Sequence, residues 1–154
     1  MLRIVLAALH LLALGIGFGS VWARANALGE RPFSAAAARR AIRADAWWGI
    51  AALLWIGTGL WRALASTEKA TAYYMHNHVF FAKMGLFLVI LALEITPIVV
   101  MGRWRKLDRQ LRDQWQPDVQ QAARMRTISH IEAFVVFMMV IAAVMLARGY
   151  GANL

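Results

Sequence analysis

The chain has 154 residues, of which 61% are hydrophobic and only 16% are charged. Together with a mean hydropathy of +0.54, these values exclude an ordinary soluble domain and a disordered tail. The length suits about four membrane-crossing helices, so we expect residues 1–154 to form a single transmembrane domain. The chain has no cysteine, which excludes disulfides, zinc–thiolate sites, iron–sulfur clusters and c-type haem attachment.

Four apolar runs, at about residues 2–22, 47–64, 79–101 and 128–147, approach the length that crosses a bilayer as a helix. Tryptophans lie near their ends, where amphipathic rings favour the membrane interface. The sequence therefore predicts an all-α fold, an integral membrane up-down four-helix bundle that contacts membrane lipids. The first run also resembles a signal peptide with a cleavage site at Ala23–Ala25, but its length and His10 favour a retained helix.

Basic side chains predict the orientation of the bundle. The formal net charge is +9, and twelve of the 17 lysines and arginines lie between runs one and two or between runs three and four. By the positive-inside rule both basic loops are cytoplasmic, so both termini and the loop at 67–78 face the periplasm or the exterior. Because these charges flank apolar runs, they indicate a membrane and no nucleic-acid partner.

Helix caps are predicted within the two basic loops. Ser34 precedes an alanine-rich segment that we expect to form a short helix leading into the second span. Pro117 and Asp118 similarly open a helix that continues into the fourth span. We therefore expect the fourth helix to project into the cytoplasm.

Polar residues at helical spacing mark one face of the first span. His10, Gly17 and Arg24 recur there with small residues between them. Since Gly17 lets another group approach the backbone, it predicts either a flat bound cofactor or close helix packing. His10, Gly17 and Arg24 are all candidate cofactor-binding residues on this face.

Lys83 and Glu94 are the ionisable residues of the third span, and they are candidate catalytic residues. They lie eleven residues apart, or about three helical turns, so they point the same way but cannot touch. Lys83 either binds a cofactor or substrate carboxylate or extends toward the membrane surface. Glu94 serves either proton transfer or a structural ion pair.

Depth in the membrane divides these candidates into two groups. His10 and Lys83 fall in the outer half, below His76 and His78, and the three histidines are candidate metal ligands. Glu94 and Glu132 fall in the inner half with His130, and Arg24 lies at the edge. Two nearby carboxylates cannot both ionise cheaply in low dielectric, so this inner group is either a proton relay or a salt-bridge network.

A haem held by both His10 and His130 is not expected. The two axial ligands must approach one iron from opposite faces, but these histidines should differ in depth by more than about 10 Å. A haem at His10 would need Lys83, His76 or His78 as its second ligand, or an open position. His130 and Glu132 also point in nearly opposite directions on one helix, so at most one of them faces the bundle.

Three short segments carry a family resemblance: His10–Leu12, Thr58–Leu60 and Phe80–Met84. With them the chain resembles a set of uncharacterised four-helix proteins of the bacterial inner (cytoplasmic) membrane. More distantly, it resembles the HemJ-type protoporphyrinogen oxidases and the membrane part of the CopD copper-resistance proteins. The HemJ resemblance implies haem b, with His10 and Lys83 as functional residues. The Leu-Pro-Arg segment of that family is replaced here by residues 21–24.

Three functions are left open by the sequence. The first is a haem-binding membrane oxidoreductase that binds a porphyrin and passes electrons to a quinone. The second is a non-catalytic accessory or assembly subunit, in a homo-oligomer or a larger membrane complex. The third is a small transporter or metal-handling protein that uses the histidines.

Overall fold

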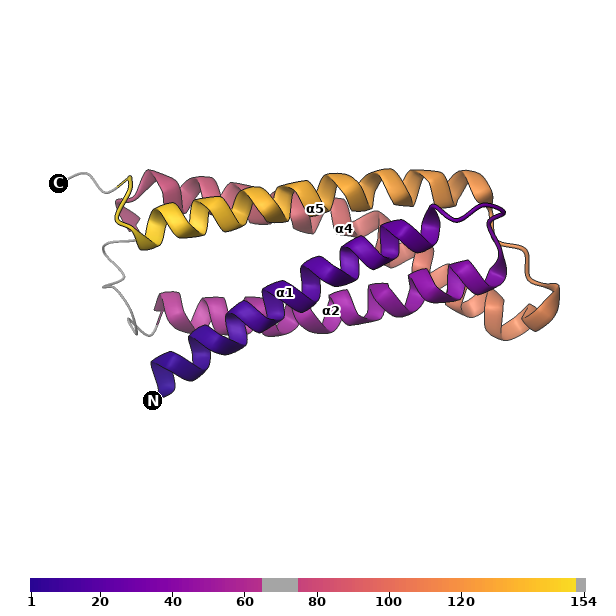
Figure 1. Ribbon diagram of the computed structural model, residues 1–154, viewed down its shortest axis with the longest axis horizontal. Helices are drawn as coiled ribbons and strands as arrows, with labels where there is room; N and C mark the ends of the chain where they lie inside the picture. The colour runs from indigo at the N-terminus through magenta and orange to yellow at the C-terminus, as the bar shows by residue number, and fades with distance from the viewer. Residues whose placement is uncertain (65–74, 152–154) are drawn as a thin grey trace.

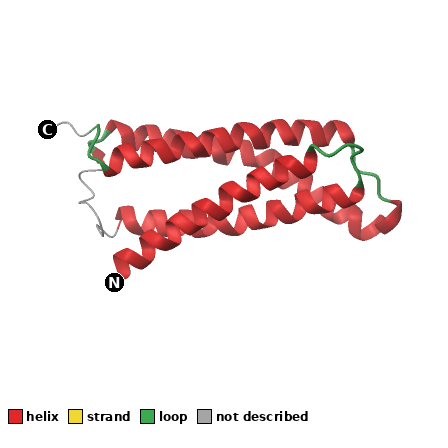
Figure 2. Ribbon diagram, in the orientation of Figure 1, coloured by secondary structure: helices red, strands yellow, loops and turns green. Residues whose placement is uncertain are grey.

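The computed structural model describes residues 1–64 and 75–151. These residues form four long helices and one short 3-10 helix. Each long helix runs antiparallel to the long helix before it in the chain (Figures 1 and 2). The long helices are α1 (Leu2–Leu28), α2 (Ala35–Leu64), α4 (His78–Leu111) and α5 (Val119–Ala147), and the 3-10 helix is η1 (Arg112–Gln114). The all-α, up-down bundle predicted from the sequence is confirmed.

The helices extend beyond the predicted spans because hydropathy marks only their apolar parts. α2 runs without a break from Ala35 to Leu64, so the short helix expected after Ser34 is the first part of α2 itself. Ser34 Oγ accepts a hydrogen bond from the Ala37 N–H at 3.2 Å. Asp118 Oδ1 caps α5 by accepting from the Gln120 and Gln121 N–H groups at 2.7 and 3.1 Å. Both predicted caps are therefore confirmed.

Three of the described helices, α1, α4 and α5, are long and apolar enough to cross a membrane. The predicted span at 47–64 lies on α2, which does not reach the same apolarity. The reason is its composition, since four tryptophans and Arg62 fall within that span. α2 nevertheless packs antiparallel against α1 (Figure 1).

Both ends of the bundle have a distinct character. The N-terminus and the end of α5 lie at one end of the bundle, together with the end of α2 and the start of α4 (Figure 1). We call this the termini end. The opposite end holds residues 29–34 and 112–118 and the arginines around them, and we call it the basic end. The 67–78 loop of the orientation prediction lies largely outside the described residues, which resume at Met75.

The termini end is fastened at Asn77, which is fully buried. Its Oδ1 caps α4 by accepting from the Val79 and Phe80 N–H groups, at 2.9 and 3.2 Å. Its Nδ2 donates to the Tyr150 carbonyl at 3.0 Å, and the His78 N–H donates to the Gly151 carbonyl at 3.2 Å. These bonds connect the turn after α5 to the start of α4.

The core consists of two apolar clusters along the bundle axis. The cluster nearer the termini end contains two tryptophans and a row of aliphatic side chains: Ala13, Val21, Trp48, Trp55, Ile90, Ala133, Val135, Val136 and Met139. The cluster nearer the basic end contains Ala27, Leu28, Ala38, Ala41, Met101, Trp104, Trp115, Ala122 and Met125. On each of the four long helices, at least one charged residue lies between the positions that belong to the two clusters.

Candidate functional site

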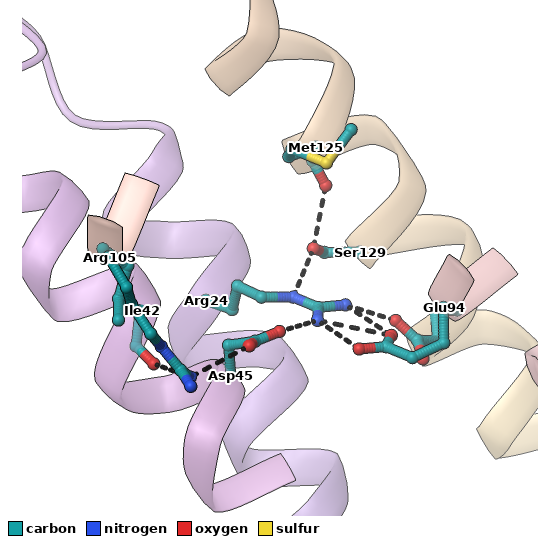
Figure 3. Close-up of polar contacts among 8 residues, drawn as sticks. Arg24, Ile42, Asp45, Glu94, Arg105, Met125 and Ser129 are labelled. Carbon is teal, nitrogen blue, oxygen red and sulfur yellow. Dashed lines mark hydrogen bonds and ion pairs between the residues drawn. The ribbon is translucent and has the colours of Figure 1, made fainter. Parts of the chain in front are cut away.

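The charged residues between the apolar clusters form a single charge centre. Its members are Arg24 on α1, Asp45 on α2, Glu94 on α4, and Ser129 and Glu132 on α5. Each of the four long helices therefore contributes at least one side chain. Figure 3 shows the Arg24 guanidinium reaching between the helices, with Asp45, Glu94 and Ser129 directed toward it.

Arg24 is fully buried, and all three of its nitrogens donate hydrogen bonds. Nε donates to Ser129 Oγ at 3.0 Å, and Nη1 donates to Asp45 Oδ1 at 2.9 Å and Glu94 Oε1 at 3.1 Å. Nη2 donates to Glu94 Oε2 at 3.3 Å and to Glu132 Oε2. The planar donor fork of arginine suits this arrangement, because one side chain can satisfy acceptors on three helices at once.

Two further contacts extend the charge centre along the bundle. The Ser129 hydroxyl donates to the Met125 carbonyl at 2.8 Å, which leaves its oxygen free to accept from Arg24 (Figure 3). Arg105 Nη2 donates to Asp45 Oδ2 at 3.3 Å and to the Ile42 carbonyl at 3.2 Å. Asp45 is therefore shared between the buried Arg24 and the half-buried Arg105 nearer the basic end.

The three carboxylates of the centre differ in exposure. The side chain of Glu132 has no exposed area, whereas Asp45 and Glu94 keep 10% and 13%. Glu132 Oε1 is buried and has no hydrogen-bond partner among the described residues. An unpaired carboxylate oxygen in such a position is costly, so this atom is the unsatisfied point of the centre.

The inner group predicted from the sequence is largely assembled here. Arg24, Glu94 and Glu132 meet, but His130 lies outside, with its ring edge-on to Trp22 at a centroid distance of 5.8 Å. His130 is exposed while Glu132 is buried, as expected from their opposite directions on the helix. Sequence reasoning missed Asp45 and Ser129. Asp45 lies two residues before the predicted second span, so the apolar run does not include it.

His10 lies farther toward the termini end, and the contacts described for it are to α2. Its Nδ1 is 2.9 Å from Thr58 Oγ1, and its ring lies 5.8 Å from that of Trp55. The Thr58 hydroxyl donates to the Leu54 carbonyl at 2.7 Å. Thr58 therefore accepts from the Nδ1–H of His10. Thr58 and the adjacent Gly59 belong to a segment that carried the family resemblance.

Two predicted cofactor-binding residues are occupied by contacts within the bundle. A Cβ atom placed on Gly17 would lie 2.8 Å from Trp48 Cζ3, so the Trp48 ring fills the space beside that glycine. Arg24 donates to four different side chains of the charge centre. Gly17 therefore serves close helix packing against Trp48, and the Arg24 guanidinium serves the charge centre.

The other candidates are spread along the bundle. Lys83 is half-buried on α4, whereas His76 and His78 are exposed near the start of that helix. Within residues 1–64 and 75–151, no three histidine, aspartate or glutamate side chains are grouped closely enough to hold a metal ion. His10, His76 and His78 thus do not form such a group there.

Comparisons with known proteins identify the family of the chain but no function. No curated protein and no solved structure matches the sequence. A family model described as a predicted membrane protein, DUF2214, matches residues 2–151. That description agrees with the three apolar helices, α1, α4 and α5, that are long enough to cross a bilayer. The chain therefore belongs to the DUF2214 family of membrane proteins.

Proposed function

We propose that this protein is a proton-handling membrane bundle in which Glu94 and Glu132 share an exchangeable proton. The single observation that carries the proposal is that both carboxyl groups bind the same guanidinium nitrogen, Nη2 of Arg24. Two carboxylates brought this close inside a membrane bundle repel each other strongly. A proton held between them removes that repulsion.

The charge balance of the centre supports the same conclusion. Arg24 and Arg105 bring two positive charges, and Asp45, Glu94 and Glu132 bring three carboxylates. One proton makes the centre neutral, which is the inexpensive state in low dielectric. When Arg105 balances Asp45, two carboxylates share the single positive charge of Arg24, so one of these two is where the added proton resides.

Asp45 connects the Glu94–Glu132 pair to the basic end of the bundle. It binds Arg24 with one oxygen and Arg105 with the other, and Arg105 is 40% exposed. By the positive-inside rule, the basic end of this multi-pass protein lies in the cytoplasm, and both termini lie on the periplasmic side of a bacterial inner membrane. The proposed proton exchange is therefore with the cytoplasm.

Infrared spectroscopy of the protein in lipid nanodiscs tests the shared proton. At neutral pH we expect a protonated-carboxyl C=O band in the wild type that is lost in Glu132→Gln and in Glu94→Gln. Glu30→Gln is the matched control, because Glu30 forms an exposed ion pair with Arg40, and it should leave the band intact. A wild-type spectrum without this band, or a band that neither substitution changes, would contradict the proposal.

Haem binding in a HemJ-like redox role is a second candidate, and the hydrogen bond of His10 favours it. A ligating histidine usually donates its second ring N–H to a neighbouring acceptor, as His10 does to Thr58. His10 Nε2 would then hold the iron, and Lys83 would bind a haem or substrate carboxylate or transfer a proton. The haem would supply one-electron chemistry, with electrons leaving to a quinone.

The absorption spectrum of the purified protein tests the haem role. A Soret band that disappears in His10→Ala and persists in His130→Ala would support it, because His130 is exposed on the outer face of α5. A colourless protein from haem-replete cells would contradict it. If that colourless protein copurified with fixed partners, the accessory-subunit function would be favoured instead.

A further inference from the structure

A second polar site lies at the basic end, between α2 and α4. It is a cavity of about 250 Å³, which we call the arginine pocket, and it is lined by Arg39, Ile42, Arg43, Arg105, Asp108 and Arg109. Four of these six side chains carry guanidinium groups and only one carries a carboxylate. The lining therefore has an excess of three positive charges, which favours an anionic ligand.

Two of the four arginines, Arg39 and Arg105, form hydrogen bonds that hold α2 and α4 together beside the pocket. Arg39 Nε donates to Asp108 Oδ1 at 2.8 Å, which joins α2 to α4. Arg105 donates to the Ile42 carbonyl and to Asp45. These bonds span both helices, so they fix the two walls of the pocket relative to each other.

The other two arginines are available for a ligand. Arg43 and Arg109 make no side-chain hydrogen bond or ion pair with any residue in the described ranges, and both are exposed. They line the same cavity from opposite helices. Arginine pairs of this kind suit a phosphate group, whose several oxygens accept bidentate hydrogen bonds.

The surface of α2 beside the pocket changes from basic to apolar along one helical face. Arg39 and Arg43 are followed at steps of three or four residues by Trp47, Ile50 and Leu54. The exposed fractions of these three side chains are 58%, 59% and 40%. This face of α2 therefore changes from arginines through Trp47 to the exposed aliphatic side chains of Ile50 and Leu54.

The surface of α4 repeats this change. Ile98 lies seven residues before Arg105, or about two turns along the same face, and is 62% exposed. The pocket therefore lies at the basic end of two apolar helix faces. A phospholipid has the same order, with a charged headgroup followed by apolar acyl chains. Basic pockets between membrane helices on the cytoplasmic side bind anionic headgroups in this way.

We propose that the arginine pocket binds the phosphate of an anionic glycerophospholipid, with the acyl chains lying along the exposed faces of α2 and α4. Arg43 and Arg109 would contact the phosphate oxygens directly, and Arg39 and Arg105 would add charge from the walls of the pocket. The source of the phosphate is the surrounding leaflet, because the apolar faces continue from the pocket into the membrane.

Native mass spectrometry of the detergent-solubilised full chain tests the proposal by titration with phosphatidylglycerol and with phosphatidylcholine of identical acyl chains. We expect preferential binding of phosphatidylglycerol, weakened roughly tenfold or more in the double variant Arg43→Gln/Arg109→Gln. The matched control is Arg103→Gln/Arg124→Gln. It removes the same charge near the basic end at two exposed arginines outside the pocket, and it should keep wild-type affinity.

Three results would overturn the proposal. The first is equal binding of the two lipids by the wild type, and the second is an equal loss of affinity in both double variants, which would reflect net charge alone. In the third, inorganic phosphate binds through Arg43 and Arg109 while phosphatidylglycerol has no advantage, which would identify a soluble phosphate as the ligand. Circular dichroism of each variant separates lost binding from lost folding.

Discussion

Glu94 and Glu132 bind the same nitrogen of Arg24, although they lie on different helices. Arg24 lies on a third helix and Asp45 on the fourth, so one guanidinium joins the whole bundle at a single level. The contacts are buried between two apolar clusters. This position makes the arrangement both a structural tie and a site where a proton has large electrostatic consequences.

Removal of Arg24 should be among the most damaging substitutions in the chain. Arg24→Met leaves three carboxylates without their shared cation, and losing one partner of a buried ion pair typically costs about 3–5 kcal/mol. Arg40→Met is the control, because the Arg40–Glu30 pair is exposed on both sides and such pairs contribute about 0–1 kcal/mol. Thermal or denaturant unfolding in detergent measures the difference. Similar stability losses in the two variants would contradict a central role for Arg24.

The damage from Arg24→Met should be reduced by a second change at Glu132. Glu132→Gln removes a charge that the first substitution leaves buried and unpaired, so the double variant should be more stable than the sum of the two single effects predicts. A coupling of about 1–3 kcal/mol is expected for side chains in one network. Additive losses would mean that Arg24 and Glu132 act independently.

Much of the charge centre could be predicted from the sequence, for a physical reason. Helix depth alone brought Glu94 and Glu132 to one level with Arg24 at its edge, because antiparallel helices of known length fix that level closely. Asp45 was missed because the apolar run on α2 starts at Trp47, although the helix itself starts at Ala35. Depth could not decide whether a cofactor or a ring lies beside Gly17, since that depends on how Trp48 packs across the interface.

Two glycines of α1 should respond oppositely to alanine. A methyl group on Gly17 would lie 2.8 and 3.0 Å from two ring atoms of Trp48, whereas one on Gly15 would meet nothing within 4 Å. Gly17→Ala should therefore destabilise the α1–α2 contact by about 1–3 kcal/mol. Gly15→Ala should be neutral or stabilising by up to about 1 kcal/mol, because alanine favours the helix. Unfolding of both variants, followed by circular dichroism, provides the measurement, and a tolerated Gly17→Ala would mean that Trp48 can move aside.

Substitution of Asn77 should loosen the turn after α5 as well as the start of α4. Asn77→Ala removes both the cap of α4 and the donation to the Tyr150 carbonyl. Loss of the cap alone typically costs about 1 kcal/mol. Hydrogen exchange should rise at Val79, Phe80 and His78, whose N–H groups depend on this junction. Asp118→Ala is the control, because it removes an exposed cap of α5 and should leave exchange at the junction unchanged.

The orientation of the bundle can be tested with single cysteines, since the natural chain has none. Gln114 lies at the basic end and Tyr150 at the termini end, and both are exposed. Because twelve of the 17 basic residues lie in or near the two loop regions of the basic end, that end should stay in the cytoplasm. A membrane-impermeant maleimide added to intact cells should label Tyr150→Cys, and should label Gln114→Cys only after the membrane is opened. The reverse pattern would place the arginine pocket and Asp45 on the outer side, and the proposed proton exchange would then face the periplasm.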